Sequence, residues 1–376
     1  MKAPKISKVD IYKINVLMGK QFNLALGVVK GAQNILVRIQ ADDDIYGLGE
    51  GSPLWFITGE TQAIAFEAAK DCARLLVSKN PSAIEERMRE LDLLLTHNST
   101  VKSAFDMALY DLLAKRAGLP LYALMGGERS DDVITNLTMG IGEPEEMAQS
   151  ALEYKGAGAH FIKAKLGNNP KEEVVRIQAI RDAIGYEIPI RIDANQAWDY
   201  VTAVEVLQRL EPFNIQYCEE PVPHWNNADL KRVGGKSPIP IMADESLFDH
   251  HDAFRLASMG ACDYFNIKLC KAGGIQGALK IIAVAEAAGI KCQLGSMLET
   301  RLGMSANAHL ASARPNITFA DLDGPMHQTE DPVAGGVIFQ GDGRIIIPDT
   351  PGHGADIHPD YLKELAGVTI LGGRDD

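Results

Sequence analysis

The spacing of apolar and polar residues changes part-way along the chain. From about residue 134 onwards, short apolar runs that end in polar residues alternate with stretches of helical period. A strand-plus-helix repeat of about 25–30 residues is typical of a (β/α) barrel. Residues 129–325 are therefore predicted to form a modified (β/α)7β TIM barrel. Its strands are expected at Ile134–Ile141, Phe161–Leu166, Ile188–Ala194, Ile215–Cys218, Ile239–Ala243, Tyr264–Ile267, Lys291–Leu294 and Ile317–Ala320, with helices between them such as Pro170–Ile184 and Gly274–Ala288.

Residues 1–128 and 326–376 have other patterns. Strands followed by helices, without alternation, indicate an α+β domain over residues 1–128. An antiparallel meander is predicted at Val9–Val16, Ile35–Ile39 and Ile45–Glu50, followed by helices at Thr61–Ser78, from Pro81, and from a Ser99 or Thr100 cap to Gly118. Val337–Phe339 and Arg344–Ile347 flank a glycine-rich turn and predict a hairpin. We assign residues 326–376 to a segment that returns to the first domain or its rim.

Two segments of the first domain, near residues 18–28 and 53–60, carry large apolar side chains where loops are expected. Phe22, Leu24 and Gly27 belong to the first segment, and Trp55 and Ile57 belong to the second. Such loops either cover a pocket on the barrel or pack between the two domains. The sequence favours neither arrangement.

Charged residues stand at the ends of several predicted strands. In a (β/α) barrel the C-terminal strand ends converge on one site, and alternate residues of a strand share a face. The residues expected to meet in one pocket are Lys163, Lys165, Asp193, Glu219, Asp244, Lys268, Asp321 and Asp323.

The residue types in this pocket indicate metal-assisted proton transfer. Asp193, Glu219 and Asp244 would repel one another unless a cation lay among them. An all-oxygen set favours Mg²⁺, with Mn²⁺ as the alternative, over zinc. Burial, neighbouring ammonium groups and the metal charge are expected to lower the pKa of a lysine, which then acts as a base. Lysines on both sides of a metal-bound carboxylate predict proton removal from one face and return to the other. Alternatively, the lysines serve only as ion-pair partners of the carboxylates.

The composition excludes some classes of protein. The chain has 376 residues and a formal net charge of −13, which argues against a nucleic-acid partner. Its five cysteines lack CxxC spacing, as expected in a reducing compartment. No apolar run has the length of a membrane span, and no signal peptide follows Met1–Lys5. We expect a cytoplasmic homo-oligomer without a membrane partner.

Five motifs of the predicted barrel resemble the enolase superfamily, in its muconate-lactonizing subgroup. They are Lys163-Ala-Lys165, Asp193-Ala-Asn195, Glu219-Glu-Pro221, Ala243-Asp-Glu245 and Asn266-Ile-Lys268. Residues 103–111 and 119–127 are similar to the capping domain of that subgroup. The resemblance implies Mg²⁺ held by Asp193, Glu219 and Asp244, with Lys165 and Lys268 as the two acid/bases. Lys163 would tune Lys165 and stabilise the enolate, with Asn195, Glu220 and Glu245 behind the ligands. Glu220 departs from the glutamine that is common in the subgroup.

Asp321-Leu-Asp323 resembles the motif with which dipeptide epimerases of this family bind the α-ammonium of their substrate. The resemblance implies 1,1-proton transfer at the Cα of the C-terminal residue of an L-Ala-L-Xaa dipeptide, giving the L,D form. Ser296, Met297 and Leu298, after the seventh barrel strand, are expected to contact the dipeptide. The alternative for the two aspartates is helix capping or an ion pair between the domains.

The capping segments predict a hydrophobic second residue in the dipeptide. Ala-Glu epimerases resemble this chain but have an arginine where this chain has Gly27, and no arginine occurs before Arg38. An Ala-Glu epimerase remains an alternative, because Lys20 and Lys30 lie near Gly27 in the sequence and could bind an acidic side chain. Further alternatives are a muconate cycloisomerase, an o-succinylbenzoate synthase or an N-succinylamino acid racemase, whose substrates bring no free α-ammonium. A non-catalytic dipeptide- or metal-binding protein is the alternative from a different class.

Overall fold

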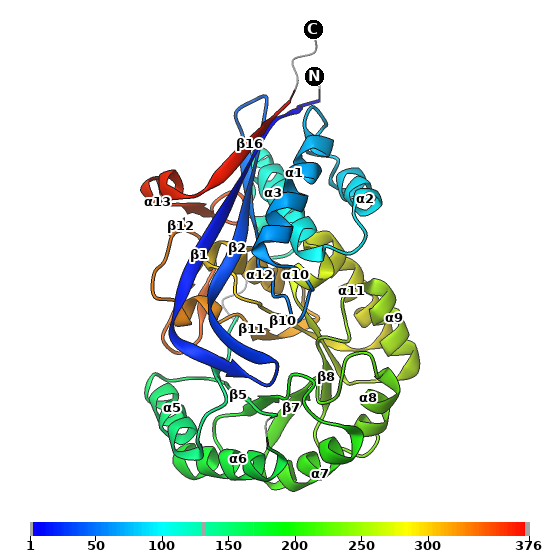
Figure 1. Cartoon of the computed structure of the whole chain (residues 1–376), viewed down its shortest axis with the longest axis vertical. Coiled ribbons are helices and arrows are strands. Elements are labelled where there is room, and N and C mark those ends of the chain that lie inside the picture. The colour runs from blue at the N-terminus through cyan, green and yellow to red at the C-terminus, as the bar shows by residue number, and fades with distance from the viewer. Residues whose placement is uncertain (1–2, 130–132, 168, 373–376) are drawn as a thin grey trace.

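The computed structural model describes residues 3–129, 133–167 and 169–372. Residues 130–132, at the predicted start of the barrel, lie outside the described residues. Figure 1 shows barrel strands inside a ring of helices and, beside them, a long antiparallel ribbon packed with further helices. The tip of this ribbon lies over the barrel (Figure 1).

The eight predicted barrel strands are confirmed and form one parallel sheet. A parallel bridge between Thr135 and Ala320 joins the two edges of this sheet and closes the barrel. The order of the strands in the sheet is the same as their order in the chain, from β4 to β11. The strands are β4 (Leu137–Met139), β5 (Ile162–Lys165), β6 (Ile190–Asp193), β7 (Ile215–Glu219), β8 (Ile241–Ala243), β9 (Tyr264–Ile267), β10 (Lys291–Gly295) and β11 (Ile317–Asp321).

Helices connect the barrel strands and cover the outside of the sheet (Figure 1). They are α5 (Pro144–Gly156), α6 (Pro170–Ile184), α7 (Tyr200–Leu210), η1 (Glu211–Phe213), α8 (Asn227–Gly234), α9 (His250–Met259), α10 (Leu269–Ala272), α11 (Ile275–Ala288) and α12 (Arg301–Ala313). A short helix, η2 (Gly324–His327), follows the last barrel strand. α6 has the predicted bounds: the Asn169 side chain accepts from the Lys171 N–H at its start, and Gly185 has a φ of 75° at its end.

The capping region is an antiparallel sheet with helices on it. The sheet order is β16-β1-β2-β3, and its buried face shares one core with the helices, in which Val37 and Ile39 of the sheet lie with helix residues such as Phe105. The elements are β1 (Ile6–Leu24), β2 (Gly27–Ala41), β3 (Tyr46–Gly51), α1 (Gln62–Leu76), α2 (Ile84–Leu94), α3 (Ser99–Ala117) and α4 (Leu121–Leu124).

Two predicted helix starts differ from the structure. Pro81 does not open α2, because the Asn80 side chain accepts from the Ser82 N–H and holds a turn there. α3 begins at Ser99 after Asn98, which has a φ of 51° and makes no capping hydrogen bond through its side chain.

The segment at residues 18–28 is not a loop, and this prediction was wrong. β1 and β2 continue to a tight turn after Leu24, with Phe22 paired with Val29 and Leu24 with Gly27. A register shift between Leu17 and Phe22 interrupts the pairing. The tip is fixed to the barrel, since the Ile141 N–H donates to the Asn23 carbonyl at 3.0 Å. Strand pairing satisfies the backbone of this segment while its apolar side chains contact the barrel.

Close packing of β3 on α3 depends on glycine at alternate positions of β3. A Cβ atom on Gly49 would lie 2.0 Å from the Ala104 carbonyl oxygen, and one on Gly47 would lie 2.0 Å from that of Ala108. Overpacking a fixed backbone contact forces the two elements apart. We expect Gly49→Ala to lower the free energy of unfolding by about 3 kcal/mol, measured by urea denaturation.

The matched control is Gly156→Ala, at the end of α5, where an added Cβ meets no atom within 4 Å. It should change the free energy of unfolding by less than about 1 kcal/mol, towards higher stability. Equal denaturation midpoints for the two variants would contradict the packing argument.

Up to residue 372, the C-terminal segment contains the predicted hairpin and three further strands. β13 (Ile338–Phe339) and β14 (Ile345–Ile346) pair as predicted, but Arg344 bridges Ile134, so the hairpin contacts the chain that leads into the barrel. β16 (Gly367–Leu371) is the strand that joins the capping sheet, beside β1. The remaining elements are β12 (Val333–Gly335), β15 (Ala355–Ile357) and α13 (Pro359–Glu364). Among the described helices, none combines the length and apolar character of a membrane span.

Candidate active site

The C-terminal ends of neighbouring barrel strands bring the predicted carboxylates together. Asp193 ends β6 and is paired with Glu219 at the end of β7, while Asp244 follows β8. These three side chains are fully buried, and one carboxylate oxygen of each lies within 4.8 Å of those of the others. Burial and the charge of Asp193 raise the pKa of Glu219 to about 8. An all-oxygen donor set with such crowded negative charge fits a hard divalent cation.

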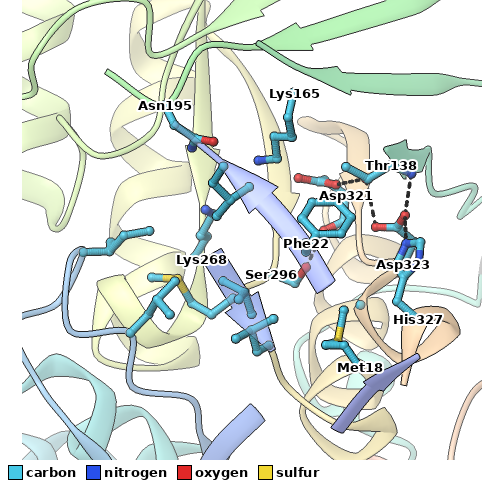
Figure 2. Close-up of a pocket in the computed structure, with 17 residues that line it drawn as sticks. Met18, Phe22, Thr138, Lys165, Asn195, Lys268, Ser296, Asp321, Asp323 and His327 are labelled. Carbon is cyan, nitrogen blue, oxygen red and sulfur yellow. Dashed lines mark hydrogen bonds and ion pairs between the residues drawn. The ribbon is translucent and has the colours of Figure 1, made fainter. Parts of the chain in front are cut away.

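Lys165 and Lys268 approach this triad from opposite sides of the barrel. Lys165 Nζ lies 2.5 Å from Asp193 Oδ2, and Lys268 Nζ lies 2.7 Å from Asp244 Oδ2. Lys165 ends β5 and Lys268 follows β9, which are four strands apart in a closed sheet of eight. Both lysine side chains line the same pocket (Figure 2). An α-carbon between them would present its two faces to different lysines.

Lys163 lies deeper than these two lysines and is fully buried. Its Nζ is 2.7 Å from Glu219 Oε2, 2.7 Å from Asp321 Oδ2 and 3.1 Å from Asp193 Oδ2. It is not among the residues that line the pocket. Its predicted role in stabilising an enolate stays a prediction, and its contacts indicate neutralisation of the buried carboxylates.

The facing carboxylates oppose the expected lowering of the pKa of Lys163 and Lys268. Burial alone would lower the pKa of Lys163 and Lys268, but the facing carboxylates raise the pKa of both. The predicted lowering depends on the charge of a cation among the carboxylates and stays a prediction.

Lys271 is a fourth ammonium group that the sequence did not reveal. It lies on α10, one helical turn after Lys268, and is buried. Its Nζ contacts both the side chain and the backbone carbonyl of Asp244. The spacing of three residues from Lys268 would have indicated that the two lysines lie on the same side of a helical turn. The sequence pattern did not predict the short helix α10 that makes this turn.

Asn195, Glu220 and Glu245 lie next to the triad, and Asn195 also lines the pocket. Asn195 donates from its backbone N–H to Asp193 at 2.9 Å and from its side chain to Glu245 at 3.1 Å. Glu220 accepts from the backbone N–H of Asp244 at 2.7 Å and also contacts Ser246. These contacts fix Asp193 at the end of β6 and Asp244 just after β8.

Asp321 and Asp323 lie at the end of β11 and share Thr138 as a partner. Thr138 Oγ1 is 3.3 Å from Asp321 Oδ1 and 3.1 Å from Asp323 Oδ1, and the Thr138 N–H donates to Asp323 Oδ2 at 2.6 Å (Figure 2). Neither aspartate pairs with a cation of the capping region among the described residues. Asp321 instead pairs with Lys163 inside the barrel.

The pocket above the triad brings barrel and capping residues together. Of the predicted substrate contacts, Gly27 does not line it, and Trp55 is 65% exposed and packs on Phe56. Sequence reasoning missed Met18, Val29, Thr138, Gly324 and His327, none of which is a carboxylate or a lysine at the end of a barrel strand. The complete lining is Met18, Phe22, Leu24, Val29, Leu54, Ile57, Thr138, Lys165, Asn195, Lys268, Ser296, Met297, Leu298, Asp321, Asp323, Gly324 and His327.

Comparison with known families accounts for nearly the whole chain. Residues 8–126 match the mandelate racemase/muconate lactonizing enzyme N-terminal domain, and residues 146–361 match the enolase C-terminal domain-like family. The chain belongs to the enolase superfamily. The resemblance of its five barrel motifs is thereby confirmed, as is the barrel with an α+β cap.

Several enolase superfamily members of known activity are similar to this chain. A D-Ala-D/L-Ala epimerase from Cytophaga hutchinsonii is 42% identical, with 97% of this chain and 99% of the relative covered. A hydrophobic dipeptide epimerase from Enterococcus faecalis is 40% identical, covering 93% and 99%. An L-Ala-D/L-Glu epimerase from Clostridium acetobutylicum is 39% identical, covering 93% and 98%.

Solved structures of two such epimerases are similar along their whole length. The dipeptide epimerase from Cytophaga hutchinsonii, complexed with Mg and D-Ala-L-Val, has a TM-score of 0.96 at 42% identity and covers 97% of this chain and 100% of that one. The Enterococcus faecalis enzyme, complexed with Mg and L-Leu-L-Tyr, has a TM-score of 0.92 at 39% identity and covers 94% and 100%.

Proposed function

We propose that this protein is a Mg²⁺-dependent dipeptide epimerase that inverts the Cα of the C-terminal residue, with a preference for a hydrophobic residue there. The observation that carries the proposal is the placement of Lys165 and Lys268 on opposite sides of one carboxylate triad. The relatives and their bound dipeptides support the substrate class.

Each lysine has one task in this reaction. One removes the Cα proton of the dipeptide's C-terminal residue, and the other returns a proton to the opposite face, which inverts the centre. Asp193, Glu219 and Asp244 would hold the metal. When bound, Mg²⁺ supplies positive charge that favours the ene-diolate form of the substrate carboxylate. Asp321 and Asp323 bind the α-ammonium group and so orient the dipeptide.

The apolar lining of the pocket supports a hydrophobic C-terminal residue. Phe22, Leu24, Leu54, Ile57 and Met297 face the cavity, and no arginine is among the described lining residues. The basic residues of the lining all have acidic partners. Lys165 and Lys268 form ion pairs with the triad, and His327 is hydrogen-bonded to Asp323. A glutamate side chain in the substrate would lose hydration there without gaining a partner.

Proton NMR in D₂O with Mg²⁺ tests this function through Cα deuterium incorporation. The substrates are L-Ala-L-Leu, L-Ala-L-Glu, the corresponding D-Ala dipeptides and N-succinyl-L-leucine. We expect kcat/KM to favour leucine over glutamate on the order of a hundredfold. Faster exchange of L-Ala-L-Glu would contradict the side-chain preference, and faster exchange of N-succinyl-L-leucine would indicate a racemase. Absence of exchange in every substrate would indicate a binding protein.

The raised pKa of Glu219 predicts pH-dependent metal binding. Below a pKa of about 8 the metal-free Glu219 is protonated, so a cation must displace that proton to bind. The apparent Mg²⁺ affinity should fall about tenfold for each pH unit below 8 and level off above it. Calorimetric titration between pH 6 and 9, in buffers of different ionisation enthalpy, measures both the affinity and the proton release.

Glu245→Gln is the control for this titration, because burial also raises the pKa of Glu245 to about 8. The pH slope should persist in this variant if Glu219 is the source of the proton. An affinity that is independent of pH in the unmodified protein would refute the prediction.

A further inference from the structure

His327 connects the capping ribbon to the acidic pair of the barrel. It lies on η2, four residues after Asp323, and its Nε2 is 3.1 Å from Asp323 Oδ2. Its ring centroid is 5.7 Å from that of Phe22, at the tip of the β1–β2 ribbon. Figure 2 shows His327 beside Asp323, with Thr138 on the other side of that carboxylate. Neither the metal triad nor the two lysines of the proposed proton transfer contact it through any described hydrogen bond or ion pair.

The hydrogen bonds of Asp323 leave one of its oxygens short of donors. Oδ2 accepts from the Thr138 N–H and from His327, so this oxygen is fixed from two directions. Oδ1 has only Thr138 Oγ1, whose single proton is also within reach of Asp321 Oδ1. Asp321 has other donors, Lys163 and Asn136. Asp323 Oδ1 is therefore the oxygen that a substrate ammonium group would satisfy.

His327 also separates two cavities. Together with Phe22 and Thr138 it lines both the active-site pocket, of about 80 Å³, and a neighbouring cavity of about 1080 Å³. The second cavity lies against α5, where Tyr154 and Glu153 contribute to its wall. A dipeptide whose ammonium group meets Asp323 has its N-terminal residue close to His327, because this ring is bonded to the same carboxylate. The active-site pocket is small, so a large side chain there needs the space beyond His327.

We propose that His327 is a positioning residue with two separable roles: its Nε2–H holds Asp323 for the substrate ammonium group, and its ring, with Phe22, limits the size of the N-terminal residue. This inference rests on the proposed function, because it requires a substrate with a free α-ammonium group. The hydrogen bond and the ring can be removed independently by substitution.

Two variants separate these roles. His327→Phe keeps a ring against Phe22 but cannot donate to Asp323, whereas His327→Gln keeps an amide donor and removes the ring. For His327→Phe we expect the KM of L-Ala-L-Leu to rise about tenfold, with little change in kcat. The inhibition constant of N-acetyl-L-Ala-L-Leu, which lacks the ammonium group, should stay unchanged.

For His327→Gln we expect a KM for L-Ala-L-Leu within about twofold of the unmodified enzyme. The ratio of kcat/KM for L-Phe-L-Leu to that for L-Ala-L-Leu should rise about tenfold, since loss of the ring opens the pocket to the second cavity. The ratio should not rise in His327→Phe. His251→Phe, at an exposed position on α9, is the control and should leave every value unchanged.

The unmodified enzyme is assayed first, so failure of the proposed function is recognised separately as absence of dipeptide exchange. If it exchanges dipeptides and His327→Phe raises the N-acetyl inhibition constant as much as the KM, the ammonium role is wrong. If both variants change KM, kcat and selectivity alike, His327 is merely structural and the inference is overturned.

Discussion

Lys165→Ala and Lys268→Ala should each reduce epimerisation at least about a thousandfold, while each still exchanges the Cα proton of one epimer. The remaining lysine faces only one side of the substrate, since the two residues lie across the barrel from each other. Removal and return by the same lysine gives deuterium incorporation without inversion. The epimer that still exchanges should differ between the two variants, as followed by proton NMR with pure L,L and L,D dipeptides.

Lys268→Arg distinguishes a base from an ion-pair partner. An arginine retains a positive charge beside Asp244 but does not give up a proton near neutral pH. If Lys268 serves only to neutralise Asp244, the arginine variant should keep most of its activity. If it transfers protons, the variant should resemble Lys268→Ala. Lys291→Ala, at the exposed start of β10, is the control and should be fully active.

Loss of exchange for the same epimer in both alanine variants would contradict the placement of one lysine on each face. Full activity in either variant would remove that lysine from the mechanism.

Glu219→Gln should abolish Mg²⁺ binding and reduce kcat/KM on the order of a thousandfold. The substitution keeps the size of the side chain and removes one of the three charges that hold the cation. The same loss leaves Lys163 without its partner at 2.7 Å. The lower negative charge of the cluster weakens affinity for a divalent cation.

Thermal unfolding with and without Mg²⁺ measures this loss directly. The unmodified protein should show a Tm that rises with Mg²⁺ concentration, and the variant should show no such rise. Glu205→Gln, which disrupts an exposed ion pair with Arg209 on α7, is the matched control and should behave as the unmodified protein. A Mg²⁺-dependent Tm in Glu219→Gln would show that Glu219 is not a ligand.

The sequence by itself determined the barrel and the residues at its strand ends. Parallel strands that are buried on both faces require apolar runs. Polar residues at the C-terminal ends of these strands lie together at one end of the barrel. Lys163 and Lys165 share a face because alternate residues of β5 do. The convergence of strand ends in a barrel placed Asp193 and Glu219 beside each other. Local periodicity was sufficient for these conclusions because strand order in the barrel follows chain order.

Only the tertiary structure decided which residues close the pocket. Phe22 lies on a continued strand because its ribbon is docked on Ile141, 118 residues away from Asn23. Trp55 points outward although it is as apolar as its neighbours. Thr138, Lys271 and His327 reach the site through contacts with residues of other elements, namely Asp321, Asp244 and Phe22. Such contacts depend on how separate elements pack, and no local pattern of hydrophobicity encodes that packing.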